Sequence, residues 1–401
     1  MYLGRVKNDS VWHSLKILFT GALLLFLINN YFGFDNALTV GEIDRWQILI
    51  HLHGGSIGWI TLSAIGIAIW VLTGEREVGT DYEGRVRKLV WAAILVFAGY
   101  IPAFGLAFSR PSGPLVALLP LFGTCAVLVL WAATIFAFGQ LRHQSPMSTV
   151  HLLAAGALLT AAIGATVGML LGLERVVGEF LPLPPGDRVG AHAGMMDTYL
   201  FLVASAVIEW GRGGLSQRWT KAGAAQALCW MISAALVPFA FFTNTVEQVL
   251  PLFGLLLLVG MVIFLARVGW RALTDLPKGA GIRAWSFFGS LWLVLYVVLF
   301  LYVVSKNADA TLMPPWFFAA FAHVGFVGMM TNLIFGVVAS RAAAGAGIMP
   351  WAEMATLWIT NLGILAFLGA KIGADVRHGA FVMGIGVLLG VVTMLRRLQA
   401  S

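Results

Sequence analysis

Long apolar runs constrain the fold of this chain more than any other feature of its sequence. A helix needs about 20 apolar residues to cross the hydrocarbon core of a bilayer. Because only 11% of the residues are charged and 60% are hydrophobic, a soluble globular fold, with about 25% charged residues, is excluded. We predict an all-α polytopic membrane protein whose twelve helices cover residues 12–33, 44–73, 88–108, 113–139, 149–173, 189–211, 220–243, 247–270, 285–305, 315–340, 351–374 and 377–396.

The positive charges of the connections predict the orientation of these helices. When alternate connections are assigned to opposite sides, 18 of the 25 Lys and Arg residues fall on the side of the two termini. The positive-inside rule then predicts a multi-pass protein of a bacterial inner membrane with both termini cytoplasmic. We expect the basic residues to orient the chain in the lipid bilayer, with no nucleic-acid partner. No linker divides the chain, so residues 1–401 are predicted to form a single transmembrane domain.

The second apolar run contains a polar motif, in which His51 and His53 are followed by Gly54 and Gly55. On a helix, residues two positions apart point about 200° away from each other. The two imidazoles can therefore serve two different sites. The glycines remove side chains from the helix wall and would let a flat group such as a porphyrin lie against the backbone. The alternative is a pair of polar residues near a helix end.

The same His-x-Gly spacing recurs twice, in the sixth and tenth predicted helices. His192 precedes Gly194 by two positions, and His323 precedes Gly325 in the same way. The motif histidines His53, His192 and His323 are 139 and 131 residues apart, and each interval holds four helices. We therefore predict three pseudo-repeats of four helices, at about 1–145, 146–278 and 279–401, with helices 2, 6 and 10 meeting at a cofactor region.

Two further ionisable residues are candidates for a functional role. Asp197 is the one carboxylate predicted to lie well inside a helix, so it is a candidate proton-handling group, with a hydrogen-bonded helix contact as the alternative. Arg377 opens the last helix from the outside, and it is a candidate cation for an acidic cofactor group. Three other outer cations could assist it, namely Arg45, Arg188 and Lys371. The alternative for Arg377 is an anchor in the membrane interface.

The stretch HLHGGSIGW, which begins at His51, resembles the His-x-His helix of subunit I of heme–copper oxidases, especially the C-family oxidases and nitric oxide reductases. The stretch HVGFVGMMTNLIFGV, which begins at His323, resembles a segment of the short membrane proteins that include the NnrS family, associated with heme, copper and nitric oxide tolerance. These resemblances imply a subunit I-like fold with one or two b-type hemes, and copper as a further candidate. They imply metal ligation by His51, His53, His192 and His323, and heme propionates held by Arg377.

The resemblance leaves the pairing of the histidines open. In the family the His-x-His helix is the tenth of twelve, whereas here it is the second. A cyclic shift of the repeats would pair His53 with His192 on one heme, direct His51 to a second site and place His323 where a copper ligand stands. Without the shift, His53 would pair with His323. Predicted helices 7 and 11 contain no histidine, so a copper site of three histidines is not expected.

Two classes of function follow from these expectations. The first is a heme-binding redox protein that handles electrons and a small gas such as NO or O2 near the periplasmic side, with electrons from a periplasmic cytochrome or quinol. If it is an enzyme, it is a heme-dependent oxidoreductase. The second is a non-enzymatic heme or copper sensor, carrier or assembly factor. A transporter is a weaker alternative, because a threefold repeat differs from the inverted repeats of secondary transporters.

Overall fold

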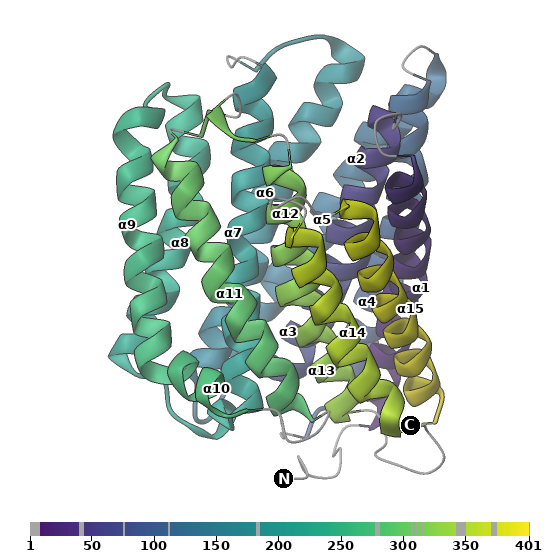
Figure 1. Ribbon diagram of the computed structural model, residues 1–401. Helices are drawn as coiled ribbons and strands as arrows, with labels where there is room; N and C mark the ends of the chain where they lie inside the picture. The colour runs from purple at the N-terminus through teal and green to yellow at the C-terminus, as the bar shows by residue number, and fades with distance from the viewer. Residues whose placement is uncertain are drawn as a thin grey trace.

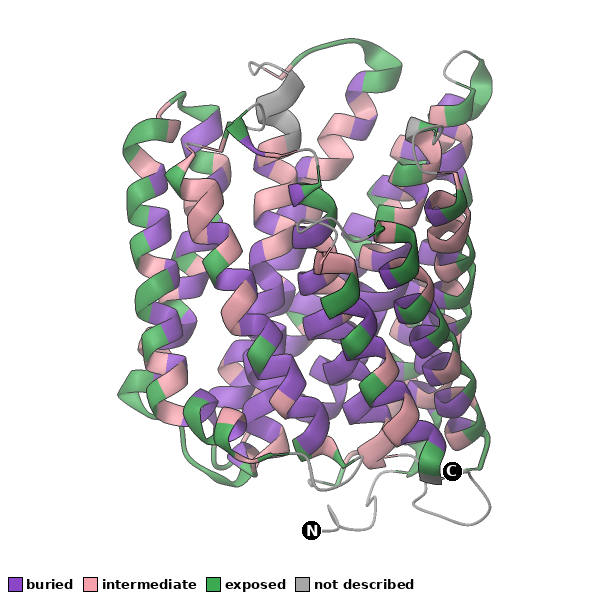
Figure 2. Cartoon of the chain, in the orientation of Figure 1, coloured by how far each residue is buried: buried purple, intermediate pink, exposed green. Residues whose placement is uncertain are grey.

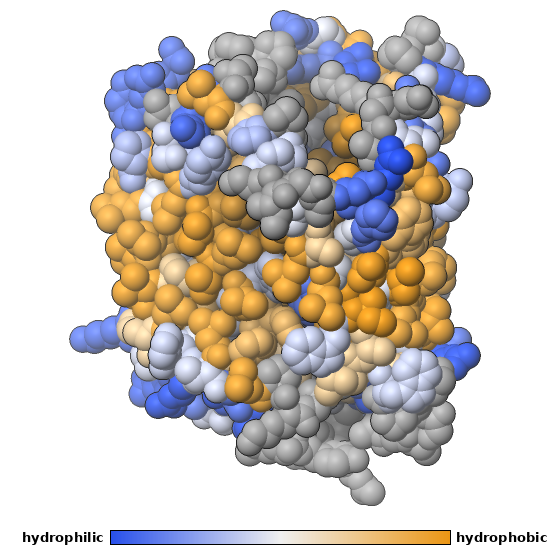
Figure 3. Space-filling model, in the orientation of Figure 1, coloured by the Kyte–Doolittle hydropathy of each residue, from blue (hydrophilic) through white to orange (hydrophobic). Residues whose placement is uncertain are grey.

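The computed structural model describes residues 9–39, 44–74, 77–110, 113–181, 185–276, 281–306, 308–309, 312–314, 316–341, 350–369 and 375–400. Every regular element in these ranges is a helix, and twelve helical spans are long and apolar enough to cross a membrane (Figure 1). The predicted all-α architecture with twelve spans is therefore confirmed. Figure 3 shows a hydrophobic band across the visible face between two more hydrophilic ends, as expected for a protein surrounded by lipid.

Several spans are interrupted helices that the structure divides into two or three elements. The spans in chain order are α1 (Asp9–Leu38); α2 (Arg45–His53) with η1 (Gly54–Thr61) and α3 (Leu62–Thr73); α4 (Thr80–Ser109); η2 (Pro114–Ala117) with α5 (Leu118–Leu141); α6 (Thr149–Val177); α7 (Pro185–Gly211); α8 (Lys221–Phe242); α9 (Val246–Phe264) with η4 (Leu265–Gly269) and α10 (Trp270–Thr274); α11 (Ile282–Ser305); α12 (Phe317–His323) with η6 (Val324–Thr331) and α13 (Asn332–Arg341); α14 (Pro350–Leu368); and α15 (Val376–Ala400). A short turn, η3 (Gly214–Ser216), follows α7.

The observed helix ends extend the predicted spans where charged residues continue the helix beyond the apolar run. The third span was predicted to begin at residue 88, but α4 begins at Thr80. Its first turn contains Asp81 and Glu83, and carboxylates stabilise a helix N-terminus by their interaction with its dipole. A hydropathy criterion cannot detect such a turn, because the turn lies in water.

Three spans form the centre of the bundle, and they are the spans that carry the His-x-Gly motifs. In the most apolar part of each span, 89% of the residues of Trp46–Thr73 are buried, 72% of those of Gly190–Gly211 and 78% of those of Phe317–Arg341. No other span in the described part of the chain exceeds 61%. The repeat in the sequence therefore marks the helices that the remaining spans surround.

The central helices are packed differently along their length. We call the end of the bundle that carries Asp9 and Ala400 the inner end. In the inner half, every residue of 58–73, 198–210 and 328–338 is buried. In the outer half, many side chains of the same three spans are only half-buried, and buried residues gather towards the inner half (Figure 2). The inner half is therefore a dense core, whereas the outer half leaves side chains of the central helices uncovered.

Buried hydrogen bonds join the three central spans. The indole Nε1 of Trp59 donates to the hydroxyl of Thr331 at 3.0 Å, and the hydroxyls of Thr61 and Tyr199 lie 2.9 Å apart. Each bond links one central span to another. Since a buried polar group without a partner destabilises the fold, these pairs define how the central helices align.

Cationic side chains close the inner end of the bundle. The guanidinium of Arg341 lies over the rings of Trp70, at 4.6 Å, and Trp210, at 5.1 Å, so that the inner ends of all three central spans meet. At the periphery, Arg267 forms a 2.6 Å ion pair with Glu209. A second ion pair joins Arg397 to Glu353.

Removing Glu209 should destabilise the protein, because Arg267 would remain largely buried without its countercharge. The side chains of Glu209 and Arg267 are only 9% and 15% exposed. Breaking such a pair by removing one partner costs roughly 3–5 kcal/mol. We expect Glu209→Ala to lower the thermal unfolding temperature in detergent by several degrees, with Glu247→Ala, an exposed carboxylate on α9, as the control. Equal unfolding temperatures for the two variants would contradict this role of the ion pair.

Candidate functional site

Four histidines of the central spans form two pairs in the outer half of the bundle. The ring centroids of His51 and His323 lie 6.1 Å apart, with an interplanar angle of 32°. His192 is the other histidine near His53, within electrostatic range of its ring. His51 and His53, although neighbours on α2, thus face different partners, as their angular separation predicts. The neighbour of His53 is thus the histidine named in the cyclically shifted arrangement rather than His323, and the metal that each pair would hold stays a prediction.

A backbone carbonyl holds the Nδ1 atom of each of these imidazoles. The Nδ1···O distances lie between 2.7 and 3.0 Å, and the acceptors are Asn29 for His51, Leu49 for His53, Gly164 for His192 and Ala319 for His323. A carbonyl oxygen only accepts hydrogen bonds, so Nδ1 donates its proton in all four rings. In the neutral ring the lone pair is then on Nε2, which is the state of a histidine that binds a metal.

Two glycines that the sequence analysis did not single out accommodate two of these rings. A Cβ atom added to Gly168 would lie 2.4 Å from Cε1 of His192, and one added to Gly33 would lie 2.9 Å from Cε1 of His51. The carbonyl acceptors for these rings are Gly164 and Asn29, one turn earlier on the same helices. Each ring therefore lies across one turn of a neighbouring helix. The spacing of Gly164 and Gly168 is the small-xxx-small pattern of close helix contacts, and it could have indicated this position.

The motif glycines have a different surrounding from the open wall that we expected. The side chain of Asn29 covers Gly54 and Gly55, since an added Cβ would lie 3.0 and 3.1 Å from its amide atoms. Val237 covers Gly194, and Tyr296 covers Gly325 in the same way. These four glycines therefore permit close packing between helices. Neighbouring side chains occupy the Cβ direction at all four positions, so the role of these glycines beside a porphyrin stays a prediction.

Two of the three central spans contain a π-helix directly after the motif histidine. η1 follows His53 and η6 follows His323. Each ends at a threonine whose hydroxyl donates to the carbonyl five residues earlier, at 2.8 Å for Thr61 and 2.9 Å for Thr331. π-Helical turns change the rotation of the helix beyond them and are frequent at functional sites. Here they separate the outer segment with the histidines from the dense inner segment.

The two histidine pairs have different neighbours. The ring of His53 stacks on Phe104 at 3.9 Å, and the ring of His323 lies 4.6 Å from that of Phe367. His192 borders a cavity with about 480 Å³ of space that protein atoms do not fill, part of it open to the surroundings. Tyr100 of α4 and Met196 of α7 are also in its wall. The wall of this cavity is therefore mainly apolar, and His192 contributes an imidazole to it.

Asp197 is part of a group of polar side chains beneath the histidines. It is half-buried on α7 and lies beside the hydroxyl of Tyr296 on α11. The neighbouring Tyr199 contacts Thr61 of η1, so polar side chains connect α11, α7 and η1. The predicted alternatives for Asp197, a proton-handling group and a helix contact, are both compatible with this position.

Of the four candidate outer cations, Arg377 is the one whose side chain lies within the described residues. Arg377 is exposed in the first turn of α15, and its backbone N–H donates to the Asp375 carboxylate at 2.9 Å. The side chains of Arg45 and Arg188 and the whole of Lys371 lie outside the described residues. Among the residues that the structure does describe, no three His, Cys, Asp or Glu side chains come together as a group that could hold a metal ion. The metal-binding potential of the site therefore rests on pairs of histidines.

The contact between Gly168 and His192 can be tested by a single methyl group. Gly168→Ala should displace the imidazole and lower the thermal unfolding temperature. Gly139→Ala is the matched control, because an added Cβ meets nothing within 4 Å there. In a helix, Ala is favoured over Gly by about 1 kcal/mol, so the control should be neutral or stabilising. If Gly168→Ala were as stable as Gly139→Ala, the close contact with His192 would be refuted.

Comparison with known proteins does not add a family to this geometry. No model of a protein family matches the sequence. No curated protein matches it either.

Proposed function

We propose that this chain is a heme-binding membrane protein of redox or gas-handling type, in which His51 and His323 are the axial ligands of one b-type heme. The proposal rests on the distance of 6.1 Å between the ring centroids of the two histidines. Two imidazoles that bind one iron through Nε2 have centroids roughly 6 Å apart, because each metal–nitrogen bond is about 2.0 Å long. Their Nδ1 atoms both donate to carbonyls, which leaves Nε2 available for the metal.

The packing of the central helices also supports a bound group in the outer half. His51, His53, His192 and His323 are each half-buried, although they belong to the spans at the centre of the bundle. Protein interiors are normally packed without such uncovered surface. A large apolar cofactor would cover it, and the dense inner half would keep water away from that cofactor on the opposite side.

The second pair, His53 and His192, is the proposed site of a second cofactor, either another heme or a copper ion. The cavity beside His192 provides space for a ligand next to it. When bound, heme iron supplies one-electron transfer and, where an axial position is open, binding of a gas such as NO or O2. Asp197 lies on the same helix as His192 and would hold a proton near this site. In this proposal electrons come from a periplasmic cytochrome or quinol, the membrane is a bacterial inner membrane and both termini are cytoplasmic.

One observation favours a second candidate function, that of a heme or copper sensor, carrier or assembly factor. Within the described ranges, the candidate ligands are pairs of histidines rather than a group of three or more. Such pairs can hold a cofactor without supplying a complete catalytic metal centre. The NnrS-like segment that begins at His323 is consistent with this role in nitric oxide stress. Activity with NO or O2 after addition of a reductant would separate the oxidoreductase from the carrier.

The two histidine pairs should affect the optical spectrum differently. We expect the reduced wild-type protein to have a Soret band and a sharp α band. His51→Ala and His323→Ala should change the same spectral component, because they remove ligands of one iron. His53→Ala and His192→Ala should leave this component in place, and His13→Ala, at an exposed position, should change nothing.

Two outcomes would contradict this assignment. Absence of a Soret band from the wild-type protein would exclude both heme-based functions. Identical spectra for His51→Ala and His53→Ala, with the same heme lost, would show that the two residues serve one site.

Arg377 is proposed to hold a carboxylate of a bound heme from the outer side. A charge-assisted hydrogen bond of this kind contributes roughly 1.5–3 kcal/mol when it is partly screened from water. Arg377→Ala should therefore weaken heme retention and lower the midpoint potential. Arg377→Lys should restore the charge without the bidentate geometry. Unchanged heme content and potential in Arg377→Ala would identify this residue as an interfacial anchor.

A further inference from the structure

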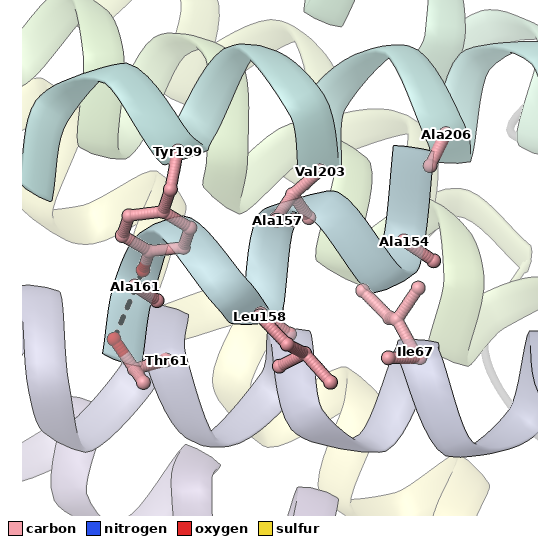
Figure 4. Close-up of a pocket in the computed structure, with 11 residues that line it drawn as sticks. Thr61, Ile67, Ala154, Ala157, Leu158, Ala161, Tyr199, Val203 and Ala206 are labelled. Atoms are coloured by element: carbon pink, nitrogen blue, oxygen red, sulfur yellow. Dashed lines mark hydrogen bonds between the residues drawn. The ribbon is translucent and has the colours of Figure 1, made fainter. Parts of the chain in front are cut away.

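A second cavity lies in the inner half of the bundle, away from the histidines. We call it the inner chamber. Figure 4 shows it between η1 and α3 on one side and α6 and α7 on the other, with the hydrogen-bonded hydroxyls of Thr61 and Tyr199 at one end. About 310 Å³ around it is not filled by protein atoms, part of it open to the surroundings, and the enclosed space admits about one small molecule. Its wall consists otherwise of apolar side chains, six of them alanines: Ala64, Ala68, Ala154, Ala157, Ala161 and Ala206.

The inner chamber continues towards the cavity beside His192, which we call the outer chamber. Thr61 is in the wall of both chambers. Along α6 the wall passes from Ala161 of the inner chamber to Ala165 of the outer chamber, one helical turn apart. Along α7 it passes in the same way from Tyr199 to Met196. The two chambers therefore follow each other along α6 and α7, with the Thr61–Tyr199 pair between them.

The polar groups of the inner chamber do not require water. The hydroxyl of Thr61 donates its proton to the carbonyl of Ser56 at 2.8 Å, so the hydroxyl of Tyr199 donates to Thr61. Neither proton is left for a water molecule. A cavity with apolar walls and satisfied polar groups stays dry, and such cavities bind xenon and other apolar molecules. Alanine at six wall positions keeps this space open, because larger apolar side chains would fill it.

We propose that the inner chamber binds a small apolar molecule, such as a diatomic gas, and that the path past Thr61 and Tyr199 delivers it to His192. Binding in the chamber is independent of any cofactor. Only the use of the delivered molecule at His192 rests on the proposed function. The class of ligand follows from the size and dryness of the chamber, since an ion or a polar metabolite would lose its hydration there without new partners.

Xenon is the probe for this site. Crystals of the full-length purified protein, pressurised with xenon, should show an anomalous scattering peak bordered by Ala157, Ala161 and Val203. In Ala157→Leu the larger side chain enters the chamber, so at least a tenfold loss of xenon occupancy is expected. Ala132→Leu, at an exposed position on α5, adds the same side chain outside the chamber and should retain the peak. If Ala157→Leu does not fold, Ala157→Val provides a smaller obstruction for the same comparison.

The results separate this inference from the heme proposal. Absence of xenon from the inner chamber of the wild-type protein would overturn the inference, whatever the optical spectrum is. Retention of full occupancy in the folded Ala157 variants would overturn it as well. A xenon peak in a protein without a Soret band would support the chamber and reject the heme. Tyr199→Phe should speed xenon exchange between the chambers. An unchanged exchange rate would show that the hydrogen-bonded hydroxyls of Thr61 and Tyr199 are not the barrier between them.

Discussion

The hydrogen bonds from histidine Nδ1 atoms to backbone carbonyls are the interaction on which the site depends. An imidazole at membrane depth is costly unless its polar atoms are satisfied. In all four central histidines a carbonyl accepts the Nδ1 proton, at 2.7 to 3.0 Å. This bond determines the tautomer and the direction of Nε2. It leaves Nε2 of each ring as the nitrogen that could bind a metal, and that is the reason to propose a bound metal.

The contrast between the two halves of the bundle follows from what each half must do. The inner half aligns the repeats through buried bonds such as that between Trp59 and Thr331, and Arg341 brings its ends together. The outer half holds the four imidazoles, each half-buried, that are proposed to bind a ligand. The π-helices η1 and η6 lie between the two regions. A rigid inner core can therefore orient ligands in an outer region that is not itself densely packed.

The sequence predicted the parts of the fold that depend on pattern. Apolar runs predicted the twelve spans, and the phase of His53, His192 and His323 predicted which spans are central. The surroundings of individual residues were harder to predict. Gly54 and Gly325 accept side chains of neighbouring helices, because the helices approach more closely than an open wall would allow.

Contacts between distant segments could not be obtained from sequence spacing either. The acceptors for His51 and His192, and the glycines beneath their rings, belong to other helices and are identified only once those helices are placed together. The angle between His51 and His53 was predictable from helix geometry, but their partners were not. Spacing within one helix is local, whereas the choice of partner depends on how the repeats associate.

The central claim is that His51 and His323 share one metal ion through Nε2. Electron paramagnetic resonance of the oxidised wild-type protein tests this most directly, because two axial imidazoles make ferric heme low-spin. We expect a low-spin ferric heme signal that is lost on replacing either His51 or His323 by alanine. A protein with no ferric heme signal, or one in which both variants keep every low-spin component of the wild type, would contradict the account.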